Sequence, residues 1–292
     1  CVLLKNENET LPLRSEHRSV ILVGPYARTR ELLGNWACKG SFDDVVTLEE
    51  GLKQADGSLT VAAFDKLEDC PEDLLARCDY IVVAVGEHWG LSGEGHSSVK
   101  LELEEEQKRL IRAVKDTGRP YACVCFSGRP LALQDIIEDM PALLWCWDPG
   151  TRAGAAVAKL LTGQATPSGK LTMSFPRDSA QAPIYYNEYS TGRPANTSSY
   201  SSRYQDCDIG PLFPFGHGQT YAGATYSDFA ISGRRITETE DLKVTFRIHN
   251  PSRYDYPEIV ILYIEDAVSR VVRPVREMKA YQVVPVPAHG SA

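Results

Sequence analysis

Short runs of almost wholly apolar residues recur through the first half of the chain, and they constrain its fold more than any other feature. The runs are Val20–Val23, Thr60–Phe64, Tyr80–Val85 and Tyr121–Phe126. Strands that are apolar throughout are typical of a parallel sheet that helices cover on both faces. We therefore expect these four segments to form strands of one buried sheet.

Helical patterns lie between and after these runs. Pro71–Cys78 carries Asp and Glu in its first turn, and Glu104–Lys115 gathers its apolar residues on one stripe. A third, Ala-rich helix is expected over Thr151–Leu161. Alternating strands and helices predict a layered α/β domain, a sandwich of sheet and helices, over residues 1–180.

The composition changes after the last helix. Pro, Gly, Ser and Tyr dominate from Thr166 to about Tyr221, which predicts a long irregular segment. Loops of this length in a compact protein are usually functional or wrap a second domain. We expect residues 181–223 to be such a linking and wrapping segment.

The final residues alternate apolar and polar side chains in short runs. Ala224–Ser232, Leu242–His249 and Ile259–Ile264 are expected to be strands of a β-sandwich over residues 224–292. About seven strands complete a sandwich, whereas three or four are predicted here, so we expect it to be partial.

Composition excludes several classes of function. The formal net charge of -8, without a Lys/Arg cluster, argues against a nucleic-acid partner. No apolar run approaches the ~20 residues that span a bilayer. The eight cysteines include no CxxC pair, which argues against structural zinc. We expect buried, reduced thiols and a cytoplasmic location, with a periplasmic or secreted protein as the alternative.

The opening residues read as though they began within a longer protein. Residue 1 is Cys, and VLLKNENETLPL lacks the basic and apolar regions of a signal peptide. We expect the chain to be a fragment, a processed product or one piece of a larger assembly.

One loop concentrates side chains that could perform chemistry. Residues 86–96 read GEHWGLSGEGH and directly follow the expected strand Tyr80–Val85. Ligand sites in open α/β sheets lie at the carboxyl ends of strands. The loop offers two carboxylates, two imidazoles and an indole. It matches neither GxGxxG, a P-loop nor the GxSxG elbow. A solvated Gly-rich loop without function remains the alternative.

Ordered sequence blocks in this chain resemble the later domains of family 3 glycoside hydrolases. They are VLLKNENETLPL, AVGEHWGLSGEG, SGRPLAL, WCWDPGTRAGAAVAKLLTGQATPSGKLTMSFPRD, YYNEYSTGRP, YSSRYQD and PLFPFGHGQTY. The resemblance implies a three-part enzyme: a TIM-like barrel with an Asp nucleophile, an α/β sandwich that carries the acid/base on a loop, and a fibronectin type III-like domain. The chain is similar to the second part and to the start of the third, and its SGEG block places the acid/base on Glu94.

The chemistry of a retaining glycosidase agrees with that assignment. Such an enzyme needs a nucleophilic carboxylate and a second carboxyl group that protonates the leaving oxygen and later activates water. A Glu on a mobile loop can close over a sugar held by another domain. Glu87, nearer the strand, is the competing carboxylate and is expected to orient the loop. The chain has Ser98-Val99 where relatives often carry Arg-Thr, which puts loop docking and substrate preference in question.

The substrate-binding candidates are Trp89, Trp36 and His96. Trp89 and Trp36 could stack on a sugar, because the CH groups of a pyranose pack on aromatic faces. Trp145 and Trp147 are expected in the core, and His217 in a turn that leads into the sandwich.

The expected function is part of a β-glucosidase-like retaining glycosidase that hydrolyses terminal β-linked glucosyl units, with xylose and N-acetylglucosamine as further sugars. No metal or organic cofactor is expected. The expected partners are a β-glucoside or oligosaccharide and a barrel domain that this chain lacks, and a homo-oligomer is left open. A carbohydrate-binding or scaffolding lobe is the first alternative, and a flavodoxin-like ligand-binding domain is the second.

Overall fold

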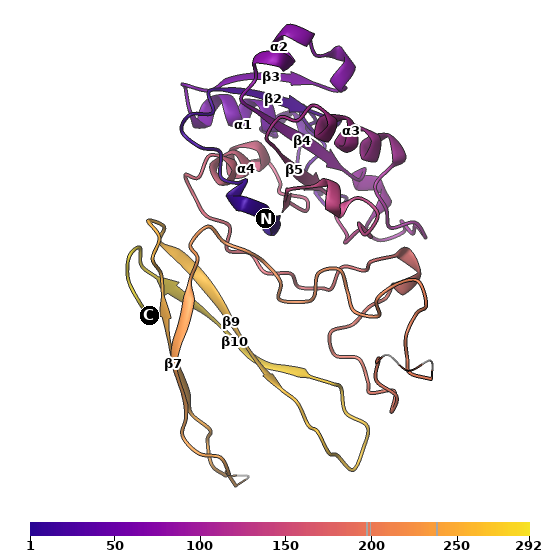
Figure 1. Cartoon of the computed structure of the whole chain (residues 1–292), viewed down its shortest axis with the longest axis vertical. Coiled ribbons are helices and arrows are strands. Elements are labelled where there is room, and N and C mark those ends of the chain that lie inside the picture. Colours follow the sequence, from indigo (N-terminus) through magenta and orange to yellow (C-terminus); the bar gives the residue numbers. More distant parts are fainter. Residues whose placement is uncertain (197, 199, 238) are drawn as a thin grey trace.

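The first half of the chain forms a sheet with helices on both faces, and the last part forms two long β-hairpins (Figure 1). The structure is a computed structural model, and it describes residues 1–196, 198, 200–237 and 239–292. An extended segment runs between the α/β layer and the hairpins (Figure 1).

The sheet has six strands in the order β1-β6-β5-β4-β2-β3. They are β1 (Val2–Asn6), β2 (Ser19–Val23), β3 (Thr60–Phe64), β4 (Tyr80–Gly86), β5 (Tyr121–Phe126) and β6 (Ala142–Trp145). Strands β2 to β6 are parallel, whereas β1 pairs antiparallel with β6 at the edge. The four expected strands are confirmed within two residues, and β1 and β6 join them.

Helices cover both faces of the sheet. Residues that alternate along each strand enter two separate clusters: Ile81 and Val83 of β4 pack in one, and Val82 and Ala84 in the other. The first cluster includes α3 (Glu105–Asp116) and α2 (Glu72–Arg77), and the second includes α1 (Leu48–Ala55) and α4 (Ala153–Leu161). The predicted α/β sandwich is therefore confirmed.

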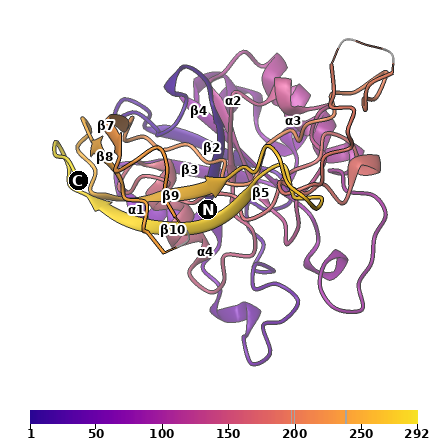
Figure 2. The same ribbon diagram turned by 90° about the horizontal axis from the view of Figure 1, so that it is seen from below.

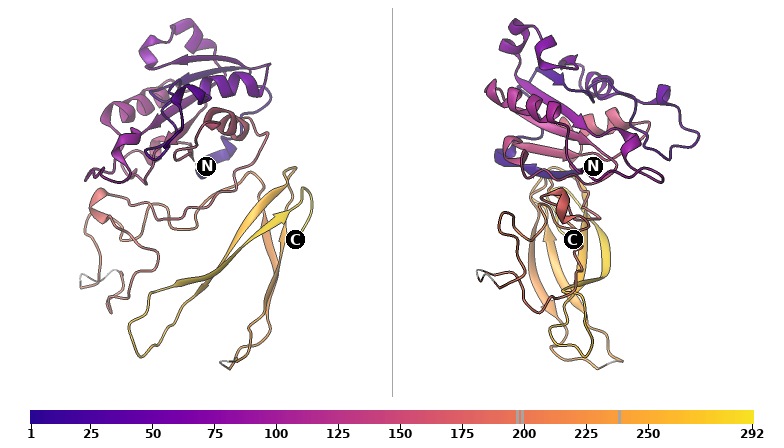
Figure 3. Two further views of the ribbon diagram at one scale, coloured as in Figure 1. Left: turned by 180° about the vertical axis from the view of Figure 1, so that it is seen from behind. Right: turned by 90° about the vertical axis from the view of Figure 1, so that its right-hand side faces the viewer.

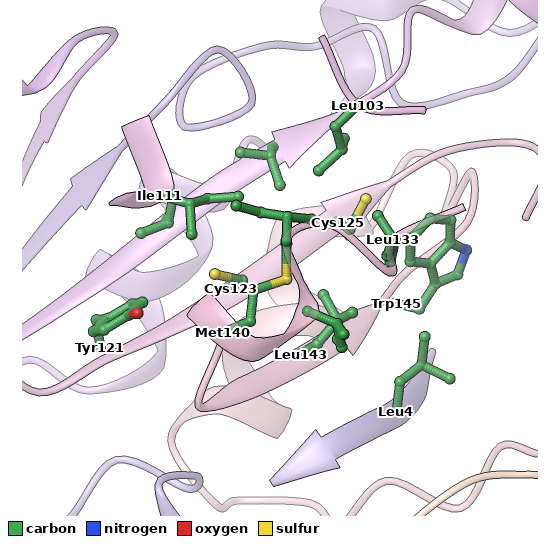
Figure 4. Packing of buried hydrophobic residues seen from close by; sticks show 14 of the residues in the cluster. Leu4, Leu103, Ile111, Tyr121, Cys123, Cys125, Leu133, Met140, Leu143 and Trp145 are labelled. Carbon is green, nitrogen blue, oxygen red and sulfur yellow. The ribbon is translucent and has the colours of Figure 1, made fainter. Parts of the chain in front are cut away.

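The cluster on the α3 side is filled by large side chains from the end of the sheet (Figure 4). Met140 and Leu143 lie beside Cys123 and Cys125 of β5, and Ile111 reaches them from α3 (Figure 4). Trp145 is fully buried and stands edge-on to Phe175, with ring centroids 4.8 Å apart. Trp145 is thus a core residue, as expected from its place at the end of an apolar run.

Helix α1 was not anticipated, although its sequence carries a start signal. The Thr47 hydroxyl accepts from the Glu50 amide at 3.2 Å, and the Glu50 carboxylate accepts from the Thr47 amide at 2.8 Å. This reciprocal pair is a capping box. Helices α1 and α4 touch through glycine: a Cβ on Gly51 would lie 2.1 Å from the Gly154 carbonyl oxygen.

The eight cysteines are free thiols, all within the described residues. Five of them are buried as expected: Cys70, Cys78, Cys123, Cys125 and Cys146. Burial raises the pKa of the Cys146 thiol to about 12. Cys38 is exposed, so the expectation of burial is wrong for that residue.

The segment after α4 makes few regular contacts. Among its described residues, the only helix or strand before β7 is the 3₁₀ turn Ser179–Gln181. One isolated bridge joins Phe175 to Phe213 within the segment. A second joins Gln219 to Leu3 of β1, so the segment contacts the α/β layer there (Figure 3).

The two hairpins pair β7 (Thr225–Ile231) with β8 (Val244–His249) and β9 (Tyr256–Ile264) with β10 (Glu277–Val286). They share a small core of Ala222, Ile248, Tyr256 and Val286. Away from it the hairpins diverge (Figures 1 and 2). Phe229, Leu262 and Tyr281 are 72%, 44% and 67% exposed.

Among the described residues, no helix combines the length and the apolar character that crossing a bilayer requires.

Candidate active site

The carboxyl ends of the parallel strands bring two loops together. One loop leaves β4 at Glu87, and the other follows β2 and includes Asn35. The Asn35 amide nitrogen donates to the Ser92 carbonyl at 3.2 Å. A Cβ on Gly93 would lie 2.5 Å from that same nitrogen, and Gly93 has a φ of +107°. Glycine at this position therefore permits both the turn and the contact between the loops.

Glu94 lies at the tip of this turn. It stands between Gly93 and Gly95, whose φ angles of +107° and +77° are both in the left-handed region. The His96 amide closes the turn by donating to the Gly93 carbonyl at 3.1 Å. The Glu94 side chain is exposed, and among the described residues it forms no hydrogen bond or salt bridge. Its carboxyl group is therefore free to meet a group outside this chain.

The other predicted site residues differ in how they are held. His96 is exposed on the same turn as Glu94. Trp36, next to Asn35, is 65% exposed, so the structure brings it to the loop that adjoins the Glu94 turn. Trp89 is half-buried, and its ring packs against Phe42 with centroids 6.0 Å apart. Trp89 is consequently part of the base of the loop, whereas Trp36 presents an open aromatic face.

Glu87 is held in a nearly buried ion pair with Arg129. The two side chains are 6% and 15% exposed. Arg129 Nε donates to one carboxylate oxygen at 2.7 Å, and its Nη2 donates to the other at 2.6 Å. Both oxygens of Glu87 are thus occupied by a planar guanidinium fork, a strong form of charge-assisted hydrogen bonding. Among the described residues, the competing carboxylate Glu87 has a partner side chain, whereas Glu94 has none.

Arg129 also reaches the far end of the loop. It donates from Nη1 to the Ser98 carbonyl at 3.1 Å and from Nη2 to the Lys100 carbonyl at 2.8 Å. One guanidinium therefore contacts both the residue that starts the loop and two residues near its end.

Asp148 is a further carboxyl group near these loops. It follows β6, and its Oδ2 atom would lie 2.8 Å from a Cβ on Gly34 and 2.9 Å from a Cβ on Gly128. The two glycines therefore leave room for this side chain. Burial, and next the negative charge of Glu87, raise the pKa of Asp148 above its ordinary value.

A pocket of about 650 Å³ opens beside the base of the loop. Tyr26, Glu87, Trp89 and Gln107 are among the residues that line it. Glu94, His96 and Trp36 do not line it, so of the predicted site residues the pocket includes only Trp89. Within the described residues, no group of three or more His, Cys, Asp or Glu side chains could hold a metal ion.

Sequence reasoning assigned no role to Arg129, Asn35 or Asp148. Arg129 belongs to the block SGRPLAL, which follows β5 directly. Since β4 and β5 are parallel neighbours, residues just beyond their carboxyl ends lie side by side. Arg129 soon follows β5, and Glu87 directly follows β4. Their pairing could therefore have been predicted from the sequence. The contacts of Asn35 and Asp148 depend on loop paths that the sequence does not reveal.

Comparison with known proteins matches this chain to one family. The model described as the glycosyl hydrolase family 3 C-terminal domain matches residues 1–221. The chain is 32% identical over 97% of its length to the periplasmic beta-glucosidase of Salmonella typhimurium, and 33% identical over 96% to a beta-xylosidase of Formosa agariphila.

Solved structures agree with the sequence relatives. The beta-glucosidase from Listeria innocua in complex with isofagomine superimposes with a TM-score of 0.89 and 34% identity, and the match covers 100% of this chain. It covers 42% of that structure, and the matches above cover 41% and 40% of the two sequence relatives. The chain therefore spans about two fifths of the length of each of these proteins.

Proposed function

This chain belongs to glycosyl hydrolase family 3, and on that premise we propose that it is the part of a retaining β-glycosidase that supplies the general acid/base, Glu94. The observation that carries the proposal is the position of Glu94 on an exposed, glycine-flanked turn, where no hydrogen bond or salt bridge to the described residues holds its side chain. A proton donor that serves a substrate held elsewhere has to be free in this way.

The proposed reaction divides its two carboxyl groups between two domains. A retaining glycosidase places its nucleophile and its acid/base about 5–5.5 Å apart across the glycosidic bond. We propose that a family 3 barrel domain provides the Asp nucleophile. Glu94 then donates its proton to the departing oxygen, and it takes a proton from the water that hydrolyses the glycosyl-enzyme.

Side chains around Glu94 support a sugar as the substrate. Trp36 offers an open aromatic face on the adjoining loop, and His96 offers a hydrogen-bonding ring on the same turn. Trp89 is more enclosed, and we propose that it supports the loop and contacts sugar only at its edge. The names of the relatives, beta-glucosidase and beta-xylosidase, favour terminal glucosyl units first and xylosyl units second.

We also propose how the chain is divided and where it works. Residues 1–180 form the domain with the acid/base loop, 181–223 the wrapping segment, and 224–292 the fibronectin type III-like part. The Salmonella typhimurium relative is named a periplasmic enzyme, which supports the periplasmic alternative for this protein over the cytoplasmic one.

The decisive experiment compares two carboxylate variants in the protein that unites this chain with its barrel. Glu94→Gln should slow hydrolysis of substrates with poor leaving groups by roughly 10²–10⁴-fold, the usual contribution of general acid–base catalysis. Nitrophenyl glycosides, whose leaving group needs little protonation, should suffer less at the first step. Azide should then restore turnover, because it attacks the glycosyl-enzyme without a general base.

Glu87→Gln is the matched control, since it removes the other carboxylate of the same loop. It should show no azide rescue. Rescue of Glu87→Gln and not of Glu94→Gln would transfer the acid/base role to Glu87.

A carbohydrate-binding lobe without catalysis is the second candidate, and the exposed Trp36 is the feature that favours it. Mixing the 292-residue chain with a separately produced barrel discriminates between the two functions. Restored hydrolysis of p-nitrophenyl glucoside supports the catalytic role, whereas glucoside binding by the chain alone, without restored hydrolysis, supports the lobe.

A further inference from the structure

We propose that Arg129 and Glu87 are positioning residues that fix both ends of the loop bearing Glu94. The proposal rests on the acid/base role of Glu94 given above. It adds that the reactivity of Glu94 depends on a buried ion pair that touches neither the sugar nor the reacting atoms.

The Glu87–Arg129 pair is anchored at the ends of two neighbouring strands. Glu87 is the residue directly after β4, and Arg129 lies three residues beyond the end of β5. These strands are central neighbours in the sheet, with Gly86 paired to Phe126 at their last position. The pair therefore stands at the carboxyl ends of the two central strands of the sheet.

Through Arg129, the pair also contacts the far end of the loop. Besides its two bonds to Glu87, the Arg129 guanidinium holds the carbonyls of Ser98 and Lys100 at 3.1 and 2.8 Å. Between them the chain projects Val99, whose side chain is 93% exposed. The loop is thus restrained within four residues of Glu94.

The loop needs such a restraint because it has little regular structure of its own. From residue 88 to residue 98 the only regular element is the 3₁₀ turn Trp89–Leu91, and three of these residues are glycines. Glycine loses more conformational freedom on ordering than any other residue. The Asn35 contact holds one side of the Glu94 turn at Ser92, and Arg129 holds the other at Ser98.

The charges of Glu87 and Arg129 depend on each other. A carboxylate and a guanidinium that are nearly buried need each other, since removal of one leaves a desolvated charge. The planar guanidinium presents several N–H groups in fixed directions, and here it uses them on a carboxylate and two carbonyls at once. Lysine carries the same charge as a single point and cannot reproduce this geometry.

The structure also offers a matched control at the other end of β5. Arg119, two residues before β5, likewise donates to two carbonyls, those of Cys78 and Ala76. Arg119→Lys repeats the same chemical change in the same domain without touching the loop.

Trypsin provides a readout that does not depend on activity, because it cuts after Lys100, whose carbonyl Arg129 holds. In the folded 292-residue chain, Arg129→Lys should raise the rate of cleavage after Lys100 by about tenfold or more, as expected for loss of a hydrogen bond to a charged group. Cleavage after Lys159, inside α4, should not change. Arg119→Lys should leave both rates as they are.

Glu87→Gln serves as the second variant if Arg129→Lys also exposes Lys159. It keeps the size of the side chain and removes the charge that orients Arg129, so it should raise cleavage after Lys100 in the same direction.

Kinetics of the complete enzyme give the second readout. Arg129→Lys should lower kcat for poor leaving groups by about tenfold more than for nitrophenyl substrates, with KM little changed and without azide rescue, since the acid/base itself remains. Unchanged cleavage after Lys100 in both variants overturns the proposal, and so does faster cleavage with normal kcat on every substrate. If cleavage rises as expected but Glu94→Gln shows no azide rescue, the role of Glu94 fails while the restraint on the loop stands.

Discussion

The imidazole of His217 donates a hydrogen bond of 2.8 Å to the main-chain carbonyl of Leu4, 213 residues earlier in the chain. A carbonyl oxygen can only accept, so the Nε2 atom of His217 carries the proton. The bond joins the segment before the hairpins to the edge strand β1. Burial lowers the pKa of His217 below its ordinary value of 6.5, against the weaker effect of the Leu4 carbonyl.

This lowered pKa predicts a loss of stability in mild acid. The unfolded chain takes up a proton on His217 at a higher pH than the folded chain does. The stability that neutral His217 contributes is complete above pH 6.5 and is lost as the pH falls through the folded pKa. Urea unfolding from about pH 7.5 to pH 5 should show the loss. His217→Gln should flatten the dependence of the free energy of unfolding on pH in that range. His96 is exposed, and His96→Gln should leave this dependence unchanged.

The close contact between helices α1 and α4 predicts that one methyl group added at Gly51 destabilises the fold. Gly51→Ala would place a Cβ 2.1 Å from the backbone oxygen of Gly154, and no side-chain rotation can relieve that clash. We expect a loss of about 1–3 kcal/mol in the free energy of unfolding, the usual cost of overpacking. Gly57→Ala, where nothing lies within 4 Å, is the control and should stay within about 0.5 kcal/mol. Equal effects of the two changes would contradict the close approach of the helices.

The raised pKa of Asp148 predicts that replacing its carboxyl group with an amide stabilises the protein. Its raised pKa means that the folded protein disfavours the charged carboxylate, first through burial and then through Glu87. Its contribution to stability is therefore greatest below the ordinary value of 3.8, declines as the pH rises through the folded pKa, and is least at neutral pH. Asp148→Asn should raise the melting temperature at pH 7, and the gain should shrink as the pH approaches 3.8. The exposed Asp266→Asn should give no gain at any pH, and a loss at pH 7 in Asp148→Asn would refute the interpretation.

The hairpins should open more easily than the sheet. Side chains such as Leu262 and Ile264 are 44% and 50% exposed, while every residue of β4 is buried. Local opening is easiest where few apolar contacts are made. Hydrogen exchange in a monomeric sample should therefore be at least about a hundredfold faster in β9 than in β4. Equal protection of the two strands would mean that something else covers the hairpins.

The sequence predicted the centre of the sheet because those strands are apolar on both faces. Tyr80–Val85 and Tyr121–Phe126 are continuous apolar runs, and such runs identify buried strands even without their neighbours. Strand β1 was missed because it ends in Lys5 and Asn6, which is the mixed character of an edge strand. Helix α1 was missed although the capping box at Thr47 and Glu50 was readable.

The candidate site was predictable in part for a related reason. The glycines around Glu94 and the position of the loop after a strand can be read from the sequence, because they are local features. The contacts of Asn35 with Ser92 and of Asp148 with two glycines join segments that are far apart in sequence. Such contacts follow from the path of a 24-residue connection, residues 24–47, that has little regular structure.

The pairing of β1 with β6 sets an order of events during synthesis. Val2 pairs with Trp145 and Asn6 with Ala142, so β1 leaves the ribosome about 140 residues before its partner. At roughly 5–20 residues per second, this interval lasts on the order of 7–28 seconds. Leu3 and Leu4, both buried in the finished fold, have no strand beside them during that time. A nascent chain stalled before residue 142 would therefore expose the apolar side chains of Leu3 and Leu4 without the strand that pairs with β1 in the finished fold.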